Sequence, residues 1–174
     1  MVALEKQGWM RSRTIAWTLV VIAVVVTVIV FAAMRFNLSA AEEPGPVETA
    51  LSNRAKRFFI RRASRHGIPP RPTDVKTSVE NGSEHYGLDC SVCHADDGQG
   101  QRPPGQWLYP RAADLTSKRV QSYSDEELFW IIQHGISYTG MPAFNKVETP
   151  DHIWDLVNYV RTLPPNLRKQ ESGR

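Results

Sequence analysis

Five consecutive residues, Cys90-Ser91-Val92-Cys93-His94, carry the most distinctive chemistry in the chain. Two thiols three positions apart can each form a thioether bond to one porphyrin, and the adjacent imidazole of His94 can bind the iron on one face. The chain has no other cysteine, so no thiol remains for a structural disulfide or a four-thiolate zinc site. A redox-active C-x-x-C pair is the alternative, but the motif lacks a βαβ context and the following histidine favours haem. The spacing therefore predicts one covalently bound haem c.

The second iron ligand is expected from Met141, because it is the only methionine after residue 34. A thioether is a soft ligand that suits haem iron, and pairing a histidine with a methionine raises the reduction potential. Gly140 allows close approach to a porphyrin, and Pro142 stiffens the loop. His85 and His134 are the alternatives, and either would give a haem with two histidine ligands. We expect His94 and Met141 to bind the iron.

The elements that position these residues are predicted to be helices, because residues 78–164 show no convincing alternation typical of strands. The first helix, 78–89, leads directly into the cysteine motif. Ser-Asp-Glu-Glu at 124–127 forms a capping box that opens a second helix, which Gly135 ends. A third helix begins at Pro150. A domain of this size has a thin apolar core of its own, and a buried porphyrin would supply the missing bulk.

This region resembles the class I c-type cytochromes, and is especially similar to the bacterial single-haem domains found free and as subunits of oxidases and dehydrogenases. Gly82, Tyr86 and Cys90 repeat the family's small residue, aromatic residue and first cysteine at four-residue steps. Those steps place Gly82 and Tyr86 on one helix face. Leu156 and Tyr159 resemble the last-helix residues that cross against it. The resemblance implies an all-α cytochrome c fold around one covalently attached haem.

The resemblance also implies roles for Pro110 and Arg111. In the family, a proline carbonyl holds the proximal imidazole and an arginine meets a haem propionate. Pro103 and Pro104 are alternatives for the first role. An acceptor on the ligand's other nitrogen is what a metal site needs, and an arginine fork suits a carboxylate. One departure from the family is Ala95, where many relatives have glycine.

An uncharged run of 21 residues, Thr14–Met34, is rich in Val and Ile. As a helix it would span about 30 Å, so the sequence predicts one transmembrane helix. Lys6, Arg11 and Arg13 precede it against a single acid, which favours a cytoplasmic N-terminus at residues 1–13. The resemblance implies haem attachment outside the cytoplasmic membrane. We therefore expect a single-pass protein of the inner membrane with its haem domain in the periplasm.

A cleaved signal peptide is the alternative to a retained anchor. Ser39-Ala40-Ala41 is a passable cleavage site with small residues. The apolar run, however, exceeds the usual signal core of about 7–15 residues, and charged Arg35 stands between the run and the site. We therefore favour a retained anchor.

Residues 35–77 are predicted to form a periplasmic linker that contains a basic helix at about 47–65. Six residues of that helix are Lys or Arg, so it suits an anionic membrane surface or a partner protein. The alternative is a solvated helix with Phe58 and Phe59 packed on the haem domain. Three prolines at 67–73 end the helix and predict a semi-rigid spacer.

The charges are unevenly distributed along the chain. Residues 78–164 hold 6 Lys/Arg against 12 Asp/Glu, a net charge of −6, whereas residues 37–77 hold 8 against 4, a net charge of +4. The high sequence pI therefore reflects the linker and the tails, including the C-terminal tail at 165–174. This distribution argues against nucleic-acid binding. The acidic haem domain favours redox partners with basic docking patches.

These features together predict an electron-transfer protein rather than an enzyme. Two axial ligands leave no open iron position for a substrate, and the sequence holds no Ser/His/Asp arrangement, phosphate loop or second metal motif. The expected partners are an integral membrane redox complex, a soluble redox protein, or both. The chain would act as a tethered shuttle or as a fixed subunit. The alternative function is a haem enzyme or gas sensor with an open or labile sixth iron position.

Overall fold

The computed structural model describes residues 2–35, 39 and 41–164. These residues form helices and turns without a β-strand, which confirms the all-helical prediction. The chain divides into two compact units, Met1–Ser39 and Ala40–Arg174. The tail predicted at 165–174, and Ala40 of the alternative cleavage site, lie outside the described residues.

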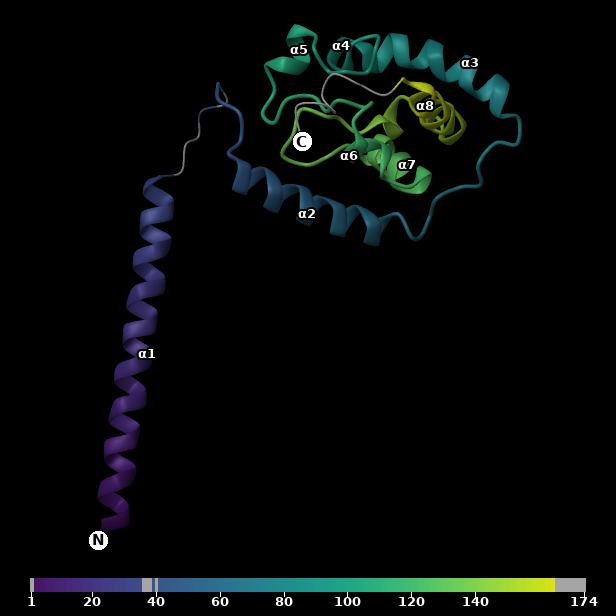
Figure 1. The fold of residues 1–174 in the computed structure, drawn as a ribbon. Helices are drawn as coiled ribbons and strands as arrows, with labels where there is room; N and C mark the ends of the chain where they lie inside the picture. Colours follow the sequence, from purple (N-terminus) through teal and green to yellow (C-terminus); the bar gives the residue numbers. More distant parts are fainter. Residues whose placement is uncertain (1, 36–38, 40, 165–174) are drawn as a thin grey trace. The chain divides into compact units, whose positions relative to one another are not determined.

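The first unit is one long helix, α1 (Val2–Met34) (Figure 1). It contains the predicted apolar run, Thr14–Met34, which has a mean hydropathy of 2.9 and is not buried within the structure. The helix begins well before that run, because no proline interrupts residues 2–13. By length and composition, the run can cross a membrane.

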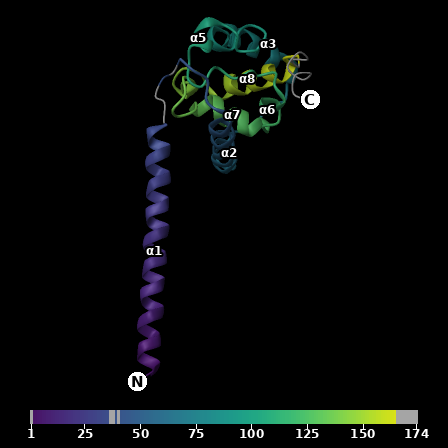
Figure 2. The same ribbon diagram turned by 60° about the vertical axis from the view of Figure 1, so that its left-hand side comes forward.

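The second unit is built around helix α8. Figures 1 and 2 both place α8 between α3 on one side and α7 on the other, with α2 outside α7. The larger helices of this unit are α2 (Pro46–Ala63), α3 (Val75–His85), α7 (Asp125–His134) and α8 (Pro150–Thr162). The short elements are a π-helical turn η1 (Tyr86–Cys90), α4 (Ser91–His94), α5 (Pro103–Gln106), α6 (Lys118–Gln121) and a 3-10 turn η2 (Phe144–Lys146).

Helices α3 and α8 cross in close contact at Gly82. A Cβ atom added there would lie 2.0 Å from the carbonyl oxygen of Asp155 and 2.9 Å from Cβ of Tyr159. One turn later, the rings of Tyr86 and Tyr159 pack with centroids 5.0 Å apart, and Leu156 is fully buried beside them. The structure thus confirms the crossing expected from the sequence. A glycine is required because two helix backbones meet there.

The apolar core of this unit forms two clusters that share helix α8. The larger cluster lies between α8 and α7, where the rings of Phe129 and Trp154 have centroids 4.8 Å apart. The smaller cluster joins α8 to the turn η1. It contains Tyr86, Leu156, Val160 and Leu163. These contacts fix the segment that carries the two cysteines.

The predicted starts of α7 and α8 agree with the observed caps. The Ser124 hydroxyl accepts from Glu127 N at 3.1 Å, and the Glu127 carboxylate accepts from Ser124 N at 2.8 Å, which completes the capping box. Gly135 ends α7 with φ 66°. Thr149 caps α8 by accepting from His152 N at 3.3 Å.

The helix predicted at 78–89 instead begins at Val75, where the Asp74 carboxylate accepts from Thr77 N at 3.2 Å. Helix α3 ends at His85, before the turn η1.

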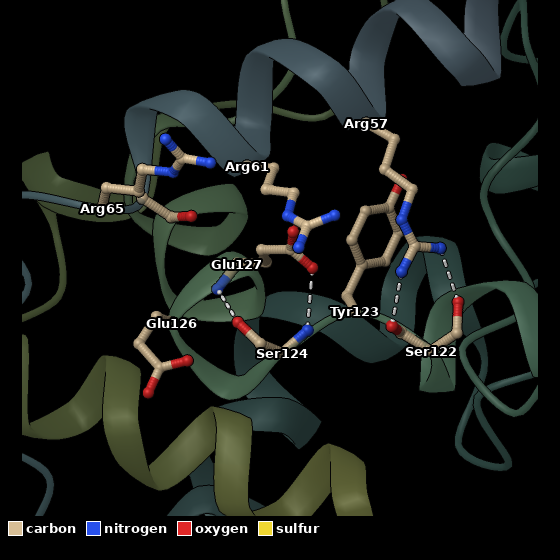
Figure 3. Close-up of a pocket in the computed structure, with 9 residues that line it drawn as sticks. Arg57, Arg61, Arg65, Ser122, Tyr123, Ser124, Glu126 and Glu127 are labelled. Carbon is tan, nitrogen blue, oxygen red and sulfur yellow. Dashed lines mark hydrogen bonds between the residues drawn. The ribbon is translucent and has the colours of Figure 1, made fainter.

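Helix α2 contacts the rest of the second unit through Ile60, Arg57 and Glu48, whose carboxylate accepts from the Tyr109 hydroxyl at 2.7 Å. Ile60 is only 4% exposed and belongs to the larger cluster. The Arg57 guanidinium donates to the side-chain and backbone oxygens of Ser122, both at 2.7 Å, and lies 4.9 Å from the centroid of the Tyr123 ring. Figure 3 shows Arg57 and Arg61 projecting from α2 across the hollow next to α7.

The alternative in which Phe58 and Phe59 pack on the haem domain is wrong. They are 64% and 65% exposed, and their rings pack edge to face on each other with centroids 5.4 Å apart. The helical period explains this, because Arg57 and Ile60 share the face toward α7 while the two phenylalanines point elsewhere. The outer surface of α2 is therefore both basic and aromatic.

The proline-rich segment 67–73 packs on α8, whereas the sequence predicted a spacer. The indole Nε1 of Trp154 donates to the Pro69 carbonyl at 3.1 Å. The Arg71 side chain pairs with Asp125 and lies 5.9 Å from the centroid of the Trp154 ring. We call residues 46–72 the strap, because they run along the domain within one compact unit. These long-range contacts have no local sequence signature.

Candidate haem site

The two cysteines lie where α3 continues through η1 into α4, so a nearly continuous helical segment carries them both. Both are partly buried free thiols. Burial, followed by the nearby Asp89 and Glu148, raises the pKa of the Cys90 thiol to about 12. The unmodified thiol is therefore uncharged at neutral pH, as befits an apolar site.

The His94 imidazole is held by one backbone carbonyl. Its Nδ1 lies 2.9 Å from the carbonyl oxygen of Ala113. Burial lowers the pKa of His94, which outweighs the opposite effect of the Ala113 hydrogen bond. A neutral ring that donates from Nδ1 leaves Nε2 with a free lone pair, which is the form that binds a metal.

Ala113, and not Pro110, holds the imidazole in this structure, so the role expected for Pro110 needs correction. Pro103 and Pro104 do not take that role either. The loop geometry explains the difference, because Ala112 N donates to Gly105 O at 2.9 Å and closes the loop two residues after Pro110. The carbonyl that reaches His94 is therefore that of the residue after this closure.

Gly105 allows this loop to lie directly on α4. A Cβ atom added at Gly105 would lie 2.1 Å from the carbonyl oxygen of Cys93. Sequence reasoning missed Gly105 and Ala113, because neither residue has side-chain chemistry. The only signal in the sequence was the position of Gly105 itself, between the cysteine motif and Pro110, since a glycine can mark a close approach of two backbones.

Arg111 lies beside carboxylate and amide oxygens. Its NH1 pairs with Glu43 Oε1 at 2.6 Å and donates to Gln106 Oε1 at 3.3 Å. The arginine is about half exposed, so its guanidinium is accessible at the end of the loop. Its contact with a haem propionate stays a prediction.

Ala95 follows the motif with φ 62° and ψ 166°, a backbone conformation that glycine adopts readily and alanine does not. The position is held by hydrogen bonds on both sides. Ala95 N donates to Ser91 O at 2.9 Å, and the Tyr86 hydroxyl donates to Ala95 O at 2.7 Å. The departure from the family's glycine at this position therefore has a structural consequence.

Ala95→Gly is expected to stabilise the haem-loaded protein by about 1–2 kcal/mol. The substitution relieves the backbone strain of the folded state, and this gain exceeds the cost of the greater conformational entropy that glycine gives the unfolded chain. Guanidinium unfolding followed by circular dichroism measures the change. The control is Ala55→Gly, at an exposed helical position of α2, which should destabilise by up to about 1 kcal/mol. Equal losses in both variants would show that Ala95 is not strained.

Met141 lies in a tight loop that follows α7. Ile136 N donates to Met141 O at 3.3 Å, and Met141 N donates to Thr139 Oγ1 at 3.2 Å. The side chain is partly buried and packs against the larger core cluster. Gly140 lies against Leu108, since a Cβ added at Gly140 would be 2.5 Å from that side chain. The loop is thus fixed by backbone bonds and packing before any ligand is considered.

The two alternative histidines have other contacts. His85 Nδ1 lies 3.0 Å from Glu148 Oε1. His134 Nδ1 lies 3.1 Å from Trp130 O, and its ring stacks on that of Trp130 with centroids 4.7 Å apart. Neither arrangement favours a second histidine ligand over Met141.

The donor set fits a covalently bound haem. Two thiols, a neutral imidazole with a free Nε2 and a partly buried thioether are the groups that this cofactor uses. Large apolar side chains near them in the sequence are exposed to solvent, and a porphyrin would cover surface of this kind. They are Leu88, Val92, Trp107 and Tyr138.

An all-helical fold that carries a covalent haem motif defines the c-type cytochromes as the class of this protein. Residues 77–160 match the family described as cytochrome c oxidase, cbb3-type, subunit III. These residues form a domain of the single-haem c-type cytochrome family. Its domain therefore binds haem c covalently and carries electrons, as the motif predicted.

Two solved structures are similar in part. A chain of the Kuenenia stuttgartiensis reducing HAO-like protein complex is 28% identical, with 56% of this chain and 48% of that chain covered and a TM-score of 0.49. The present chain thus spans about half the length of that protein. Cytochrome CL from Methylophaga aminisulfidivorans is 15% identical, with 79% of this chain and 84% of that chain covered and a TM-score of 0.42. A search of the curated proteins finds no match.

Proposed function

We propose that this chain is a membrane-anchored, single-haem cytochrome c that passes single electrons on the periplasmic side. It would serve as a subunit of a larger membrane electron-transport complex or as a tethered donor to one. In this proposal Cys90 and Cys93 form the thioether bonds, and His94 and Met141 bind the iron. The observation that carries it is the His94 imidazole, neutral and fixed through Nδ1 by Ala113.

The haem supplies one-electron chemistry at its iron, and the polypeptide sets the conditions for that chemistry. The Ala113 carbonyl fixes the orientation of the His94 ring and increases its basicity as a ligand. The backbone bonds around Met141 hold its loop in place. A rigid ligand set favours rapid electron transfer, because little has to move when the charge changes. Arg111 offers its guanidinium to a propionate.

The anchor and the strap support a place in a membrane assembly. The apolar run of α1 is long enough to span a bilayer. The exposed phenylalanines and arginines of α2 offer a surface for assembly.

The net charge of −6 over residues 78–164 supports a partner with a basic docking patch. Such association is fast at low ionic strength and slows as salt screens the charges. The basic strap and the acidic domain lie within one compact unit, so this chain presents both signs of charge to its surroundings.

Purification from the native membrane in mild detergent tests this function. We expect the chain to elute with other redox subunits, or to reduce or oxidise a membrane complex when added back. We also expect the reduced protein not to bind carbon monoxide readily, because both axial positions are filled. Ready binding of carbon monoxide by the unaltered protein would instead favour the haem enzyme or gas sensor.

The double variant Phe58→Ala/Phe59→Ala separates the subunit from the shuttle. It removes the exposed aromatic surface of α2 and leaves Ile60 and Arg57 in their contacts with the domain. A fixed subunit is expected to lose co-purification in this variant while its haem spectrum is unchanged. A monodisperse lone chain in both proteins would count against the subunit and for the shuttle.

A further inference from the structure

Two histidines and a glutamate meet where the end of α3 faces the start of α8. His85 is the last residue of α3, Glu148 lies two residues before α8, and His152 lies in its first turn. The two Nδ1 atoms lie 3.0 and 2.9 Å from the two different oxygens of the Glu148 carboxylate. One possible ligand atom from each residue lies within 4.8 Å of the other two. These residues take no part in the haem site proposed above.

The donor set and its spacing suit a divalent transition metal. Imidazole nitrogen together with carboxylate oxygen is a common ligand set for zinc. Two atoms bound to one tetrahedral zinc, each at about 2.0–2.1 Å, lie about 3.3 Å apart. The nitrogen-to-oxygen distances in the cluster, 3.0 and 2.9 Å, are hydrogen-bond lengths slightly below that separation, so a bound ion would replace these two hydrogen bonds with only small movements of the side chains. The imidazole rings also lie side by side, with centroids 4.1 Å apart and planes tilted by 32°.

The cluster is held by its surroundings before any ion binds. The Glu148 side chain is only 6% exposed, whereas those of His85 and His152 are 24% and 41% exposed. The carboxylate is therefore fixed from within, and solvent reaches the cluster from the histidine side. Glu148 N also donates to Phe144 O at 2.8 Å, in the segment that follows Met141.

A fourth oxygen donor lies one helical turn after His85. Asp89 is hydrogen-bonded to Glu148, and burial followed by that contact raises the pKa of Asp89. Burial also opposes ionisation of Glu148, yet its bonds to Asp89, His85 and His152 lower the pKa of that carboxyl. Two carboxyl groups thus share a site with two imidazoles: His85 and Asp89 come from the helical segment α3–η1, and Glu148 and His152 come from the turn before α8 and its first turn.

We propose that His85, Glu148 and His152 bind one divalent transition-metal ion, of which Zn²⁺ fits the donor set best, with Asp89 or water as the fourth ligand. The ion would cross-link the helical segment that leads into the cysteines to the segment that follows Met141. With Asp89 as the fourth ligand the site would be closed by protein groups, as structural zinc sites are. The site is independent of the electron-transfer function proposed above.

Isothermal titration of the full, haem-loaded chain in detergent, after dialysis against a chelator, tests the site with Zn²⁺ alone. We expect one ion per chain and a higher midpoint of thermal unfolding with zinc. His152→Ala and Glu148→Gln should each weaken binding by at least about tenfold, since both remove a ligand. Zinc-edge X-ray absorption should show two imidazoles and oxygen at about 2.0–2.1 Å.

His134→Ala is the matched control, because this exposed histidine lies outside the cluster and contacts Trp130. It should bind zinc as the unaltered protein does. Glu148→Gln keeps the size of the side chain, so an unchanged haem spectrum verifies that the variant is folded. Absence of zinc binding at millimolar concentration, or equal loss in His134→Ala and His152→Ala, would show that the cluster only holds the two helices together.

Discussion

Gly82→Ala is expected to destabilise the haem domain by several kcal/mol, the largest effect of any single methyl group that we can identify in this protein. The added carbon would lie 2.0 Å from the Asp155 carbonyl oxygen, which belongs to the backbone of α8. Neither partner is a flexible side chain, so the two helices must move apart. In an unobstructed helix the same substitution would stabilise by up to about 1 kcal/mol, and the clash must outweigh that gain.

The measurement is guanidinium unfolding of the haem-loaded protein, followed by circular dichroism. Gly87→Ala is the matched control, because a Cβ atom added at Gly87 meets nothing within 4 Å. It lies five residues further along the same helical segment and should change stability by no more than about 1 kcal/mol. Equal stability of the two variants would show that α3 and α8 do not cross in close contact at Gly82.

The consequence for the haem follows from the position of the crossing. The segment that leads from Gly82 to Cys90 is held by the packing of Tyr86 on Tyr159 and by the Tyr86 hydroxyl bond to Ala95. Separating α3 from α8 would displace this segment together with the first cysteine. We therefore expect a lower yield of protein with covalently attached haem from Gly82→Ala than from Gly87→Ala.

Met141→Ala is expected to remove the sulfur-to-iron absorption band of the oxidised protein and to lower the reduction potential. A histidine–methionine pair raises the potential, so its loss should lower it by on the order of 0.1 V, a modest part of the roughly 0.8 V range that axial ligands span. The reduced variant should also bind carbon monoxide, because the sixth position becomes open. Absorption spectroscopy and potentiometric titration measure these changes.

Two further variants separate coordination from packing at this position. Met141→Leu keeps most of the apolar contact with the core cluster but removes the sulfur, so it should lose the same band with a smaller loss of stability. His134→Ala should retain the band, since that ring stacks on Trp130. Loss of the sixth ligand in His134→Ala or His85→Ala, with the band retained in Met141→Ala, would overturn the ligand assignment.

Local chemistry made much of this protein predictable from its sequence. The capping box at Ser124 and Glu127 and the stop at Gly135 depend on contacts within one or two helical turns, and the structure confirms them. The four-residue step between Gly82 and Tyr86 places both on one helix face, and the crossing with α8 was expected from the resemblance to the class I c-type cytochromes.

The strap was not predictable in the same way. Its sequence is basic and rich in proline, which is typical of an exposed linker, and the residues that bind it are distant in sequence. Arg57 contacts Ser122, and Trp154 binds the Pro69 carbonyl. These contacts depend on which backbone oxygens the completed fold leaves accessible.

The sequence by itself determined the chemistry of the site, because residue type and spacing fix which thiols, imidazole and thioether are available and which helix faces they share. Only the tertiary structure decided which carbonyl holds His94, that Ile60 rather than Phe58 or Phe59 faces α7, and that His85 meets Glu148 and His152. Those outcomes depend on backbone atoms and on segments far apart in the chain. Every residue has the same carbonyl group, so residue type cannot show which of them a loop will bring to a ligand.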